Sequence, residues 1–174
     1  MTFEIHSDIT NRSMTIASRA MRRVLRRKRN IIWAIYGWSV FFINALLLIP
    51  FDGESFALDV TTVTALLVEV MLLSVLLFRD RFNGMIACKN TLAGTKAYHF
   101  VFGEDSYTII TEVVTSTFHY ELIDALAESQ DYIIFLMKKR YAQPLDKRTL
   151  TGGTVEEFKR FLEEKTGKTF RRVK

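Results

Sequence analysis

Two long apolar blocks constrain the fold of this chain more than any other feature. They cover residues 31–50 and 58–78, and most charged residues lie outside them. A helix rises about 1.5 Å per residue and the hydrocarbon core of a bilayer is about 30 Å thick, so about 20 apolar residues can cross it. Each block is that long. Two core helices of a soluble protein would need a polar shell that the rest of the chain is too short to supply. We therefore expect a membrane α-helical hairpin.

The basic residues predict how this hairpin is oriented. Arginines and a lysine at positions 26–29 precede the first block, and Arg79 and Arg81 follow the second, whereas residues 51–57 contain no basic residue. Basic residues flanking a membrane span favour the cytoplasmic side. We therefore expect a multi-pass protein of the cell (inner) membrane, with both termini cytoplasmic and residues 51–57 as an external acidic loop.

The basic excess of the chain is concentrated beside the first block. There are 24 Lys and Arg residues against 19 Asp and Glu, and seven of the basic residues fall between positions 19 and 29. A basic run next to a membrane span favours contact with anionic lipid headgroups over binding of nucleic acid. The lipid bilayer is thus the first expected partner. The candidate lipid-contact residues are Arg22, Arg23, Arg26, Arg27, Lys28 and Arg29.

Three polar residues inside the blocks are candidate intramembrane sites, namely Glu69, Asn44 and Ser39. An ionised carboxylate in the middle of a membrane helix costs about 2.5–3.5 kcal/mol, so we expect Glu69 to be neutral or paired. Counting inward from the outer ends of two antiparallel helices places Glu69 level with Trp38 and Ser39, and Asn44 about one turn further out. A protonated Glu69 donating a hydrogen bond across the hairpin or a dimer interface is the simpler interpretation. A proton or ion relay is the alternative.

The rest of the chain divides into three further segments. Residues 1–30 are expected to hold a short strand and a basic juxtamembrane helix that runs on into the first block, and residues 79–95 a helical connector. The pattern becomes strand-like after residue 95, which predicts a cytoplasmic α+β domain at 96–174 that folds alone. Its expected strands cover residues 98–102, 107–111, 113–120, 125–129, 132–138 and 141–145.

The end of this domain has the clearest local signals. Residues 132–137 are apolar at every position, which is typical of a central strand covered on both faces. Thr154 and Glu157 have the spacing of a capping box, and Gly167 follows the last turn of the helix that they begin. Several strands followed by one closing helix is the order of a pleckstrin-homology-like barrel capped by a C-terminal helix.

The residues of this domain also resemble those of a known family. The similar positions are residues 100–107 (FVFGEDSY), 120–123 (YELI), 146–150 (DKRTL) and 153–158 (GTVEEF), with Glu128 and Tyr132 between them. On these motifs the chain resembles YcxB-like membrane proteins, which have two transmembrane helices followed by a small C-terminal domain. Many members have a proline where this chain has Asp146, which affects one turn. The resemblance implies an architecture and no particular activity.

No residue pattern in the sequence predicts catalysis. His6, His99 and His119 lack metal-site spacing, and the lone Cys88 fits a reducing compartment. Ser116, His119 and Asp124 are the residue types of a catalytic triad but lie within nine positions without a nucleophile elbow. Residues 151–154 (TGGT) are better explained as a capping turn than as a phosphate site. We therefore expect no catalytic residue, cofactor, metal or small-molecule substrate.

Two functional hypotheses follow from these features. The first is a non-enzymatic, membrane-anchored interaction or regulatory module that presents a small barrel at the cytoplasmic face to a protein partner or to its own copy. The second is a membrane transport or channel component that oligomerises around Glu69. A membrane enzyme acting on lipid remains a third and weaker alternative, because convergent sites need no linear motif.

Overall fold

The structure, a computed structural model, describes residues 2–47, 60–92, 94–138 and 141–173. It contains two compact units: a helical unit formed by Arg27–Arg79, and a second unit that combines Met1–Arg26 with Asp80–Lys174. The N-terminal segment and the connector thus join residues 96–174 in one unit, called the sandwich unit below. The expected external loop, residues 51–57, lies outside the described residues.

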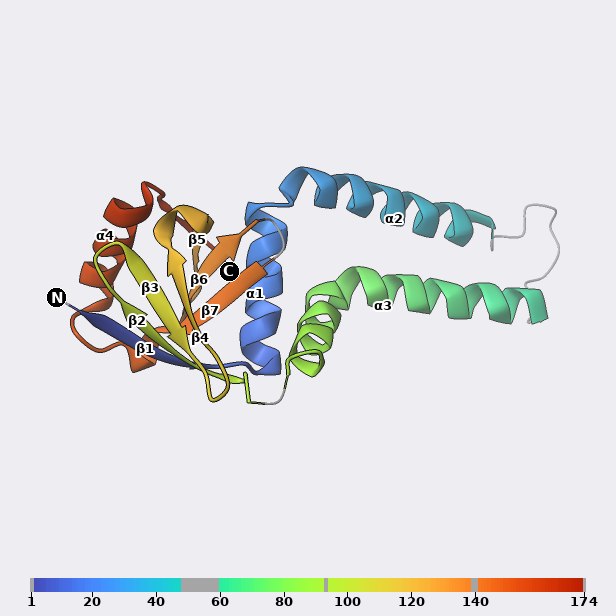
Figure 1. Cartoon of the computed structure of the whole chain (residues 1–174). Helices are drawn as coiled ribbons and strands as arrows, with labels where there is room; N and C mark the ends of the chain where they lie inside the picture. Colours follow the sequence, from blue (N-terminus) through green and yellow to red (C-terminus); the bar gives the residue numbers. More distant parts are fainter. Residues whose placement is uncertain (1, 48–59, 93, 139–140, 174) are drawn as a thin grey trace. The chain divides into compact units, whose positions relative to one another are not determined.

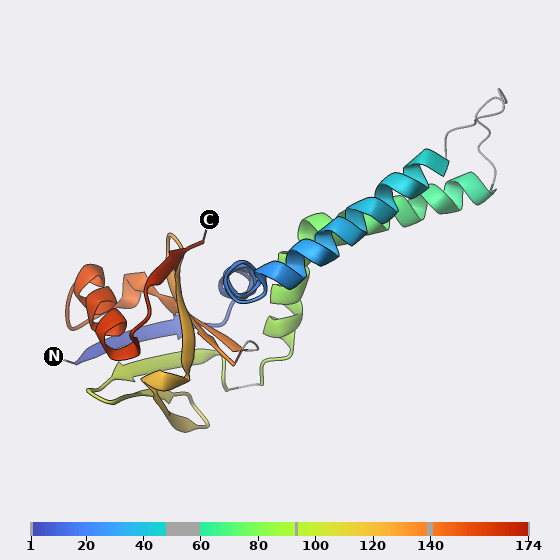
Figure 2. The same cartoon turned by 90° about the horizontal axis from the view of Figure 1, so that it is seen from above.

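The helical unit consists of α2 (Arg27–Leu47) and most of α3 (Val60–Lys89), which run antiparallel side by side (Figures 1 and 2). A methyl group added at Gly37 would lie 2.8 Å from Cδ2 of Leu76, so the helices approach closely there. The two helices run in opposite directions and rise equally per residue. Asn44 lies seven residues after Gly37, and Glu69 lies seven residues before Leu76. Glu69 is therefore level with Asn44. The expected alignment of Glu69 with Ser39 was wrong, because it assumed that both helices start equally far from the loop.

One helix of the described residues is long and apolar enough to cross a membrane. This span is Thr62–Lys89, and only 6% of its most apolar stretch is buried. A core helix of a soluble protein would be mostly buried, whereas this helix exposes apolar side chains on most of its surface. The expected connector is also helical, because α3 continues through it to Lys89.

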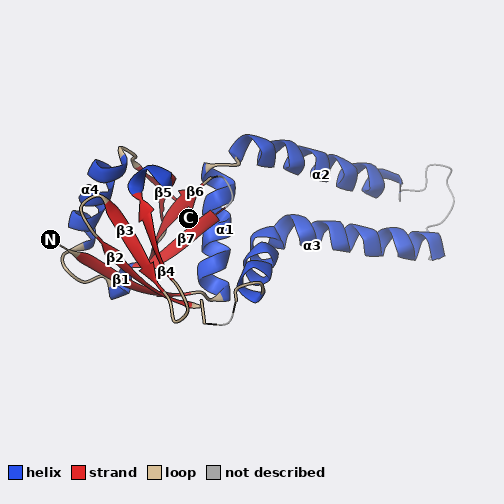
Figure 3. Cartoon of the chain, in the orientation of Figure 1, coloured by secondary structure: helices blue, strands red, loops and turns tan. Residues whose placement is uncertain are grey.

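The sandwich unit contains two four-stranded sheets, drawn in red in Figure 3. The first is antiparallel, in the order β1-β2-β3-β4, and the second has the order β7-β6-β5-β8 with β8 parallel to β5. The short 3-10 helix η1 (Tyr120–Leu122) connects β4 to β5, and a second one, η2 (Lys147–Thr149), follows β7. The strands are β1 (Phe3–Asp8), β2 (Ala97–Phe102), β3 (Ser106–Ile110), β4 (Thr115–His119), β5 (Ile123–Glu128), β6 (Tyr132–Met137), β7 (Tyr141–Asp146) and β8 (Phe170–Arg172).

All six strands expected after residue 95 are present, with ends shifted by no more than two residues. The prediction of a central strand at 132–137 is confirmed, because β6 lies between β5 and β7 and is buried at every position. One of its faces packs into the core between the sheets, and the other packs against α1 (Asn11–Val24). The short strand β8 was not expected, since three residues in a basic tail carry no usable periodicity.

The basic juxtamembrane helix that was expected to run on into the first apolar block is interrupted. Helix α1 begins at a capping box made by Thr10 and Ser13 and ends at Val24. The amides of Leu25 and Arg26 both donate to the carbonyl of Met21, which closes the helix before α2 begins at Arg27. The small residues Ala17 and Ala20 are buried on the second sheet, so α1 is part of the sandwich unit.

The C-terminal helix α4 (Val155–Thr166) closes one end of the sandwich. Its expected capping box is confirmed, as Thr154 and Glu157 bond each other's backbone amides, and Gly167 ends it in the left-handed conformation at φ 64°. The Phe158 ring lies 5.2 Å from the ring of Phe3 and 4.8 Å from that of Phe102. These contacts fill the space between the sheets at this end and leave the opposite end of β2 uncovered by α4.

Candidate functional site: an apolar pocket between the sheets

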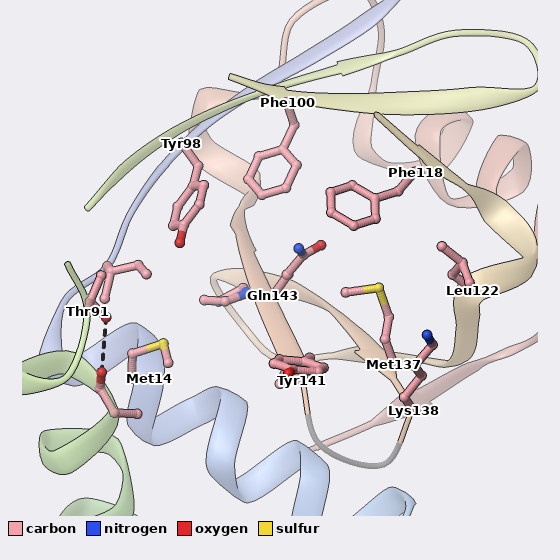
Figure 4. Close-up of a pocket in the computed structure, with 14 residues that line it drawn as sticks. Met14, Thr91, Tyr98, Phe100, Phe118, Leu122, Met137, Lys138, Tyr141 and Gln143 are labelled. Carbon is pink, nitrogen blue, oxygen red and sulfur yellow. Dashed lines mark hydrogen bonds between the residues drawn. The ribbon is translucent and has the colours of Figure 1, made fainter. Parts of the chain in front are cut away.

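A cavity of about 640 Å³ lies at the end of the sandwich away from α4 (Figure 4). Both sheets contribute to its wall, and so do Ile9, Met14 and the last turn of α3. Its volume falls within the range of about 300–1,000 Å³ that is usual for small-ligand sites. The side chains that matter most below are Tyr98, Phe100, Phe118, Leu122, Met137 and Gln143.

Strand alternation explains why aromatic side chains gather in this cavity. Tyr98, Phe100 and Phe102 are two residues apart on β2, so their side chains point to the same face of the sheet. Phe102 is fully buried near α4, Phe100 is nearly so, and Tyr98 is half-buried. The same row of side chains therefore forms core at one end and the pocket wall at the other.

A hydrogen bond joins the two sheets beside the pocket. The hydroxyl of Tyr107, on β3, donates to Oε1 of Gln143, on β7, over 3.2 Å and lies 3.4 Å from Sδ of Met137. Burial, with a smaller effect of Tyr120, raises the pKa of Tyr107 far above its usual value. The phenol is therefore a neutral donor with no role as an acid or base near neutral pH.

The mouth of the pocket carries its few other polar groups. Burial raises the pKa of Tyr98, which therefore stays a neutral phenol. Lys138 is exposed and follows β6 in a left-handed conformation at φ 46°, which is uncommon for a residue with a side chain. Its side chain lies on the same side of the pocket as Met137 and Leu122 (Figure 4). No acidic residue is among the described residues that line this pocket.

The three candidate intramembrane residues have different environments in the helical unit. Glu69 is 7% exposed, and neither of its carboxyl oxygens has a hydrogen-bond partner within the described ranges. Nδ2 of Asn44 donates to the carbonyl of Val40 in its own helix over 3.0 Å, and Ser39 is exposed. The hydrogen bond from Glu69 across the hairpin is therefore not formed in this structure, because the amide level with it is turned to its own backbone.

The basic residues nominated for lipid contact do not all remain available. Nε and a terminal nitrogen of Arg22 bind the carboxylate of Asp80 at 2.7 and 2.5 Å, and this pairing raises the pKa of Arg22. Arg22 thus connects α1 to α3 within the sandwich unit. Arg26 is half-buried. The exposed members of the set are Arg23, Arg27, Lys28 and Arg29.

The described residues offer no constellation for catalysis. No group of three His, Cys, Asp or Glu residues among them could hold a metal ion. Ser116 and His119 are three residues apart on β4, so their side chains point to opposite faces of the sheet. The turn before α4 is occupied by its own cap, since the Glu157 carboxylate accepts from the amide and hydroxyl of Thr154. An anion would compete with that carboxylate.

Sequence reasoning missed the pocket entirely. The alternation on β2 was visible, but it predicts only which side chains face inward. Whether they meet a partner or border a cavity depends on where α4 stops, which is a tertiary property. Similarly, His6 and His99 stand alone in sequence, yet the pairing of β1 with β2 stacks their rings 4.1 Å apart.

Comparison with protein families places part of the sandwich unit in a known family model. The model of the YcxB-like protein family matches residues 102–162, which run from the end of β2 to α4. This range covers the four predicted motifs apart from the first two residues of the earliest one. Comparisons with curated proteins and with solved structures found no match.

Proposed function

We propose that the protein is a non-enzymatic, membrane-anchored module, in which α2 and α3 form a transmembrane hairpin and the sandwich unit is a cytoplasmic binding domain. The observation that carries this proposal is the apolar surface of the helical unit. Ile32 of α2, Phe42 of α2 and Leu67 of α3 are 67%, 64% and 66% exposed. Exposed apolar surface on this scale marks a contact with lipid or with another protein.

The charges at the start of α2 support the same proposal. Arg27, Lys28 and Arg29 occupy its first turn, which has no acidic residue. Cations at a helix N-terminus oppose the helix dipole, so they do not serve the stability of the helix itself. Positive charge at the cytoplasmic end of a membrane span provides a reason for them. Both termini would then be cytoplasmic, at the inner membrane.

The sandwich unit supplies the binding part of the proposal. Two four-stranded sheets with a helix closing one end favour a pleckstrin-homology-like arrangement with an open second end. The open end has an apolar pocket lined without acidic residues or a catalytic pair among its described members. Such a pocket is suited to binding, either of a small molecule or of an apolar side chain from a protein partner.

Reporter fusions test the membrane part of this proposal. A reporter that fluoresces only in the cytoplasm should give signal when fused after Lys174 and none when inserted after Gly53. A reporter active only outside the cytoplasm should give the opposite result. The matched variant replaces Arg27, Lys28 and Arg29 with Glu and should reduce the difference between the two sites. Fluorescence at both sites in the unaltered chain would contradict the hairpin.

A second candidate function follows from Glu69. Among the described residues Glu69 has no hydrogen-bond partner, and a carboxyl group buried in this way between helices is a feature of proton pathways as well as of structural sites. A transport or channel component assembled around Glu69 is therefore the alternative, and proton flux through the reconstituted protein distinguishes it from the module.

A further inference from the structure

We propose that the pocket of the sandwich unit binds the hydrocarbon chain of an anionic amphiphile and that Lys138 receives its headgroup. The shared chemistry is a long apolar chain ending in a carboxylate or phosphate, as in a free fatty acid or a membrane phospholipid. The inference rests on the proposed function in one respect, because a membrane-anchored domain has such molecules at hand.

The interior of the pocket favours an apolar chain. Phe100, Phe118 and Met137 supply aromatic and thioether surface, and Leu122 adds aliphatic surface at the rim (Figure 4). The Tyr107 hydroxyl, beside the pocket, is already bonded to Gln143, whose side chain lines it. A polar group inserted beside Tyr107 would give up its hydration without a hydrogen bond from this hydroxyl, whereas burial of a methylene chain is favourable.

The mouth of the pocket favours an anionic head. Lys138 is the one charged residue among the described lining residues, and no carboxylate lies beside it there to oppose an anion. The neutral phenol of Tyr98 lies on the opposite side of the pocket from Lys138 (Figure 4). Hydrogen bonds between an ammonium and a carboxylate or phosphate are stronger than neutral ones. A cation at the mouth of an apolar cavity is complementary to an anionic amphiphile.

The pocket is also bordered by the helix that can cross a membrane. Ala87, in the last turns of α3, and Thr91, just after its end, line the cavity. The Thr91 hydroxyl bonds the carbonyl of Ala87 over 3.0 Å, which leaves the aliphatic part of both side chains for the wall (Figure 4). A molecule bound in the pocket would therefore contact the end of α3 directly.

Photocrosslinking of the full chain in phosphatidylcholine nanodiscs tests the inference. A long-chain fatty acid carrying a diazirine in its chain is added and irradiated, and the labelled residues are mapped by mass spectrometry. We expect labelling at Phe118 and Met137, and we expect excess oleate to abolish it. The matching fatty alcohol should give at least about fivefold less labelling.

In a second arm, a phosphatidylglycerol with a diazirine chain is built into the nanodisc. Pocket labelling in this arm identifies the bilayer as a source, and labelling in the first arm alone identifies the free acid.

Two pairs of variants locate the effect in the pocket. Lys138→Glu should weaken pocket labelling about fivefold, the effect of about 1 kcal/mol expected for one exposed charge. The control is Lys168→Glu, at an exposed lysine that follows α4 and does not line the pocket. Leu122→Trp should narrow the mouth and reduce labelling, whereas Val114→Trp, at an exposed site outside the lining, should not.

The outcomes separate this inference from the proposed function. Labelling confined to α2 and α3 in both arms would overturn the pocket assignment while leaving the membrane anchor in place. Equal pocket labelling by the acid and the alcohol, or no effect of Lys138→Glu, would overturn the role of the headgroup. If the chain fails to enter nanodiscs, the proposed function is wrong. The labelling experiment is then repeated in buffer with dissolved fatty acid, where labelling at Phe118 and Met137 supports the pocket and its absence contradicts it.

Discussion

The hydroxyl of Tyr107 on β3 donates to Oε1 of Gln143 on β7, and this 3.2 Å bond joins the two sheets beside the pocket. The Tyr107 side chain is fully buried, whereas Gln143 is half-buried, so the bond is only partly shielded from water. Its ring also stacks near Phe102 and Phe118, at 5.8 and 5.6 Å between centroids. The Tyr107 ring thus belongs to the core, and its hydroxyl contacts two residues that line the cavity, Gln143 and Met137.

Tyr107→Phe should destabilise the sandwich unit by about 0.5–1.5 kcal/mol, the usual net contribution of one hydrogen bond. The ring and its stacking remain, and the Gln143 amide is only partly buried, so water can replace the lost donor. Hydrogen exchange of β3 and β7 amides in the full chain measures the change. Tyr141→Phe is the matched control, because Tyr141 is on the same strand as Gln143 but is exposed. An equal effect of the two substitutions would show that the bond contributes nothing.

The sandwich unit should also lose stability in alkali. Burial, with smaller effects of neighbouring oxygens, raises the pKa of both Tyr107 and Tyr120 in the folded chain. The unfolded chain releases these protons from about pH 10 upward, whereas the folded chain retains them. The folded state then binds more protons than the unfolded state, so the free energy of unfolding falls as pH rises above about 10. Tyr107→Phe should reduce the steepness of this fall, and an unchanged pH profile would contradict the assignment.

The sequence predicted the fold well where local pattern decides it and poorly where tertiary contacts do. The capping box at Thr154 and the buried strand at 132–137 depend on side chains close in sequence, and both are confirmed. The pairing of β1 with β2 joins Phe3 to Phe102, which more than half of the chain separates. No local pattern indicates such a pairing. The pocket, which depends on the reach of α4, could not be predicted for the same reason.

The same pairing changes what is expected of residues 96–174 expressed alone. This fragment lacks β1, whose Phe3 and Ile5 are buried in the core, and burying each contributes about 1.5–3 kcal/mol. Together they contribute about 3–6 kcal/mol, a large share of the about 5–15 kcal/mol by which a typical domain is stable. We therefore expect the fragment to be poorly folded, contrary to the prediction from sequence.

A fragment that restores the N-terminal segment should fold. Arg22 and Asp80 are paired, so the chain ends at 26 and 80 can be joined by a short Gly/Ser linker that replaces residues 27–79. Dispersed amide spectra are expected from this joined fragment and collapsed spectra from residues 96–174. A well-folded 96–174 fragment would show that β1 and α1 are dispensable.

Glycine is required in α3 at position 84 but not in α2 at position 37. A methyl at Gly84 would lie 2.5 Å from the backbone nitrogen of Thr15 in α1, whereas a methyl at Gly37 would meet only the tip of the Leu76 side chain. Alanine gains up to about 1 kcal/mol of helix propensity at either site. Gly84→Ala should still lower the thermal stability, by about 1–3 kcal/mol through overpacking, while Gly37→Ala should be neutral or stabilising. Equal effects at the two sites would mean that α1 and α3 do not approach closely at Gly84.

Glu69 distinguishes the anchor from the transport function. Its carboxyl oxygens are buried without a hydrogen-bond partner within the described ranges, and the amide level with it donates within its own helix. The sequence led to the expectation that Glu69→Leu would weaken helix association by about 0.6–2 kcal/mol, the range for hydrogen bonds between membrane helices. The described residues of one chain contain no such bond, so this expectation now applies only to a bond across a dimer interface.

If the protein is an anchor that does not dimerise through Glu69, Glu69→Leu should raise the thermal stability of the full chain in nanodiscs. It removes a buried carboxyl group that has no hydrogen-bond partner within the described ranges, which costs about 1–3 kcal/mol. Glu69→Gln should change stability less, since the amide is equally polar and equally buried, and neither variant should alter ion flux because the unaltered protein should show none. A transport role requires a proton to bind and leave, which Gln cannot support. Reconstituted protein that conducts protons, and loses this flux in Glu69→Gln while still inserting normally, would replace the anchor with the transport function.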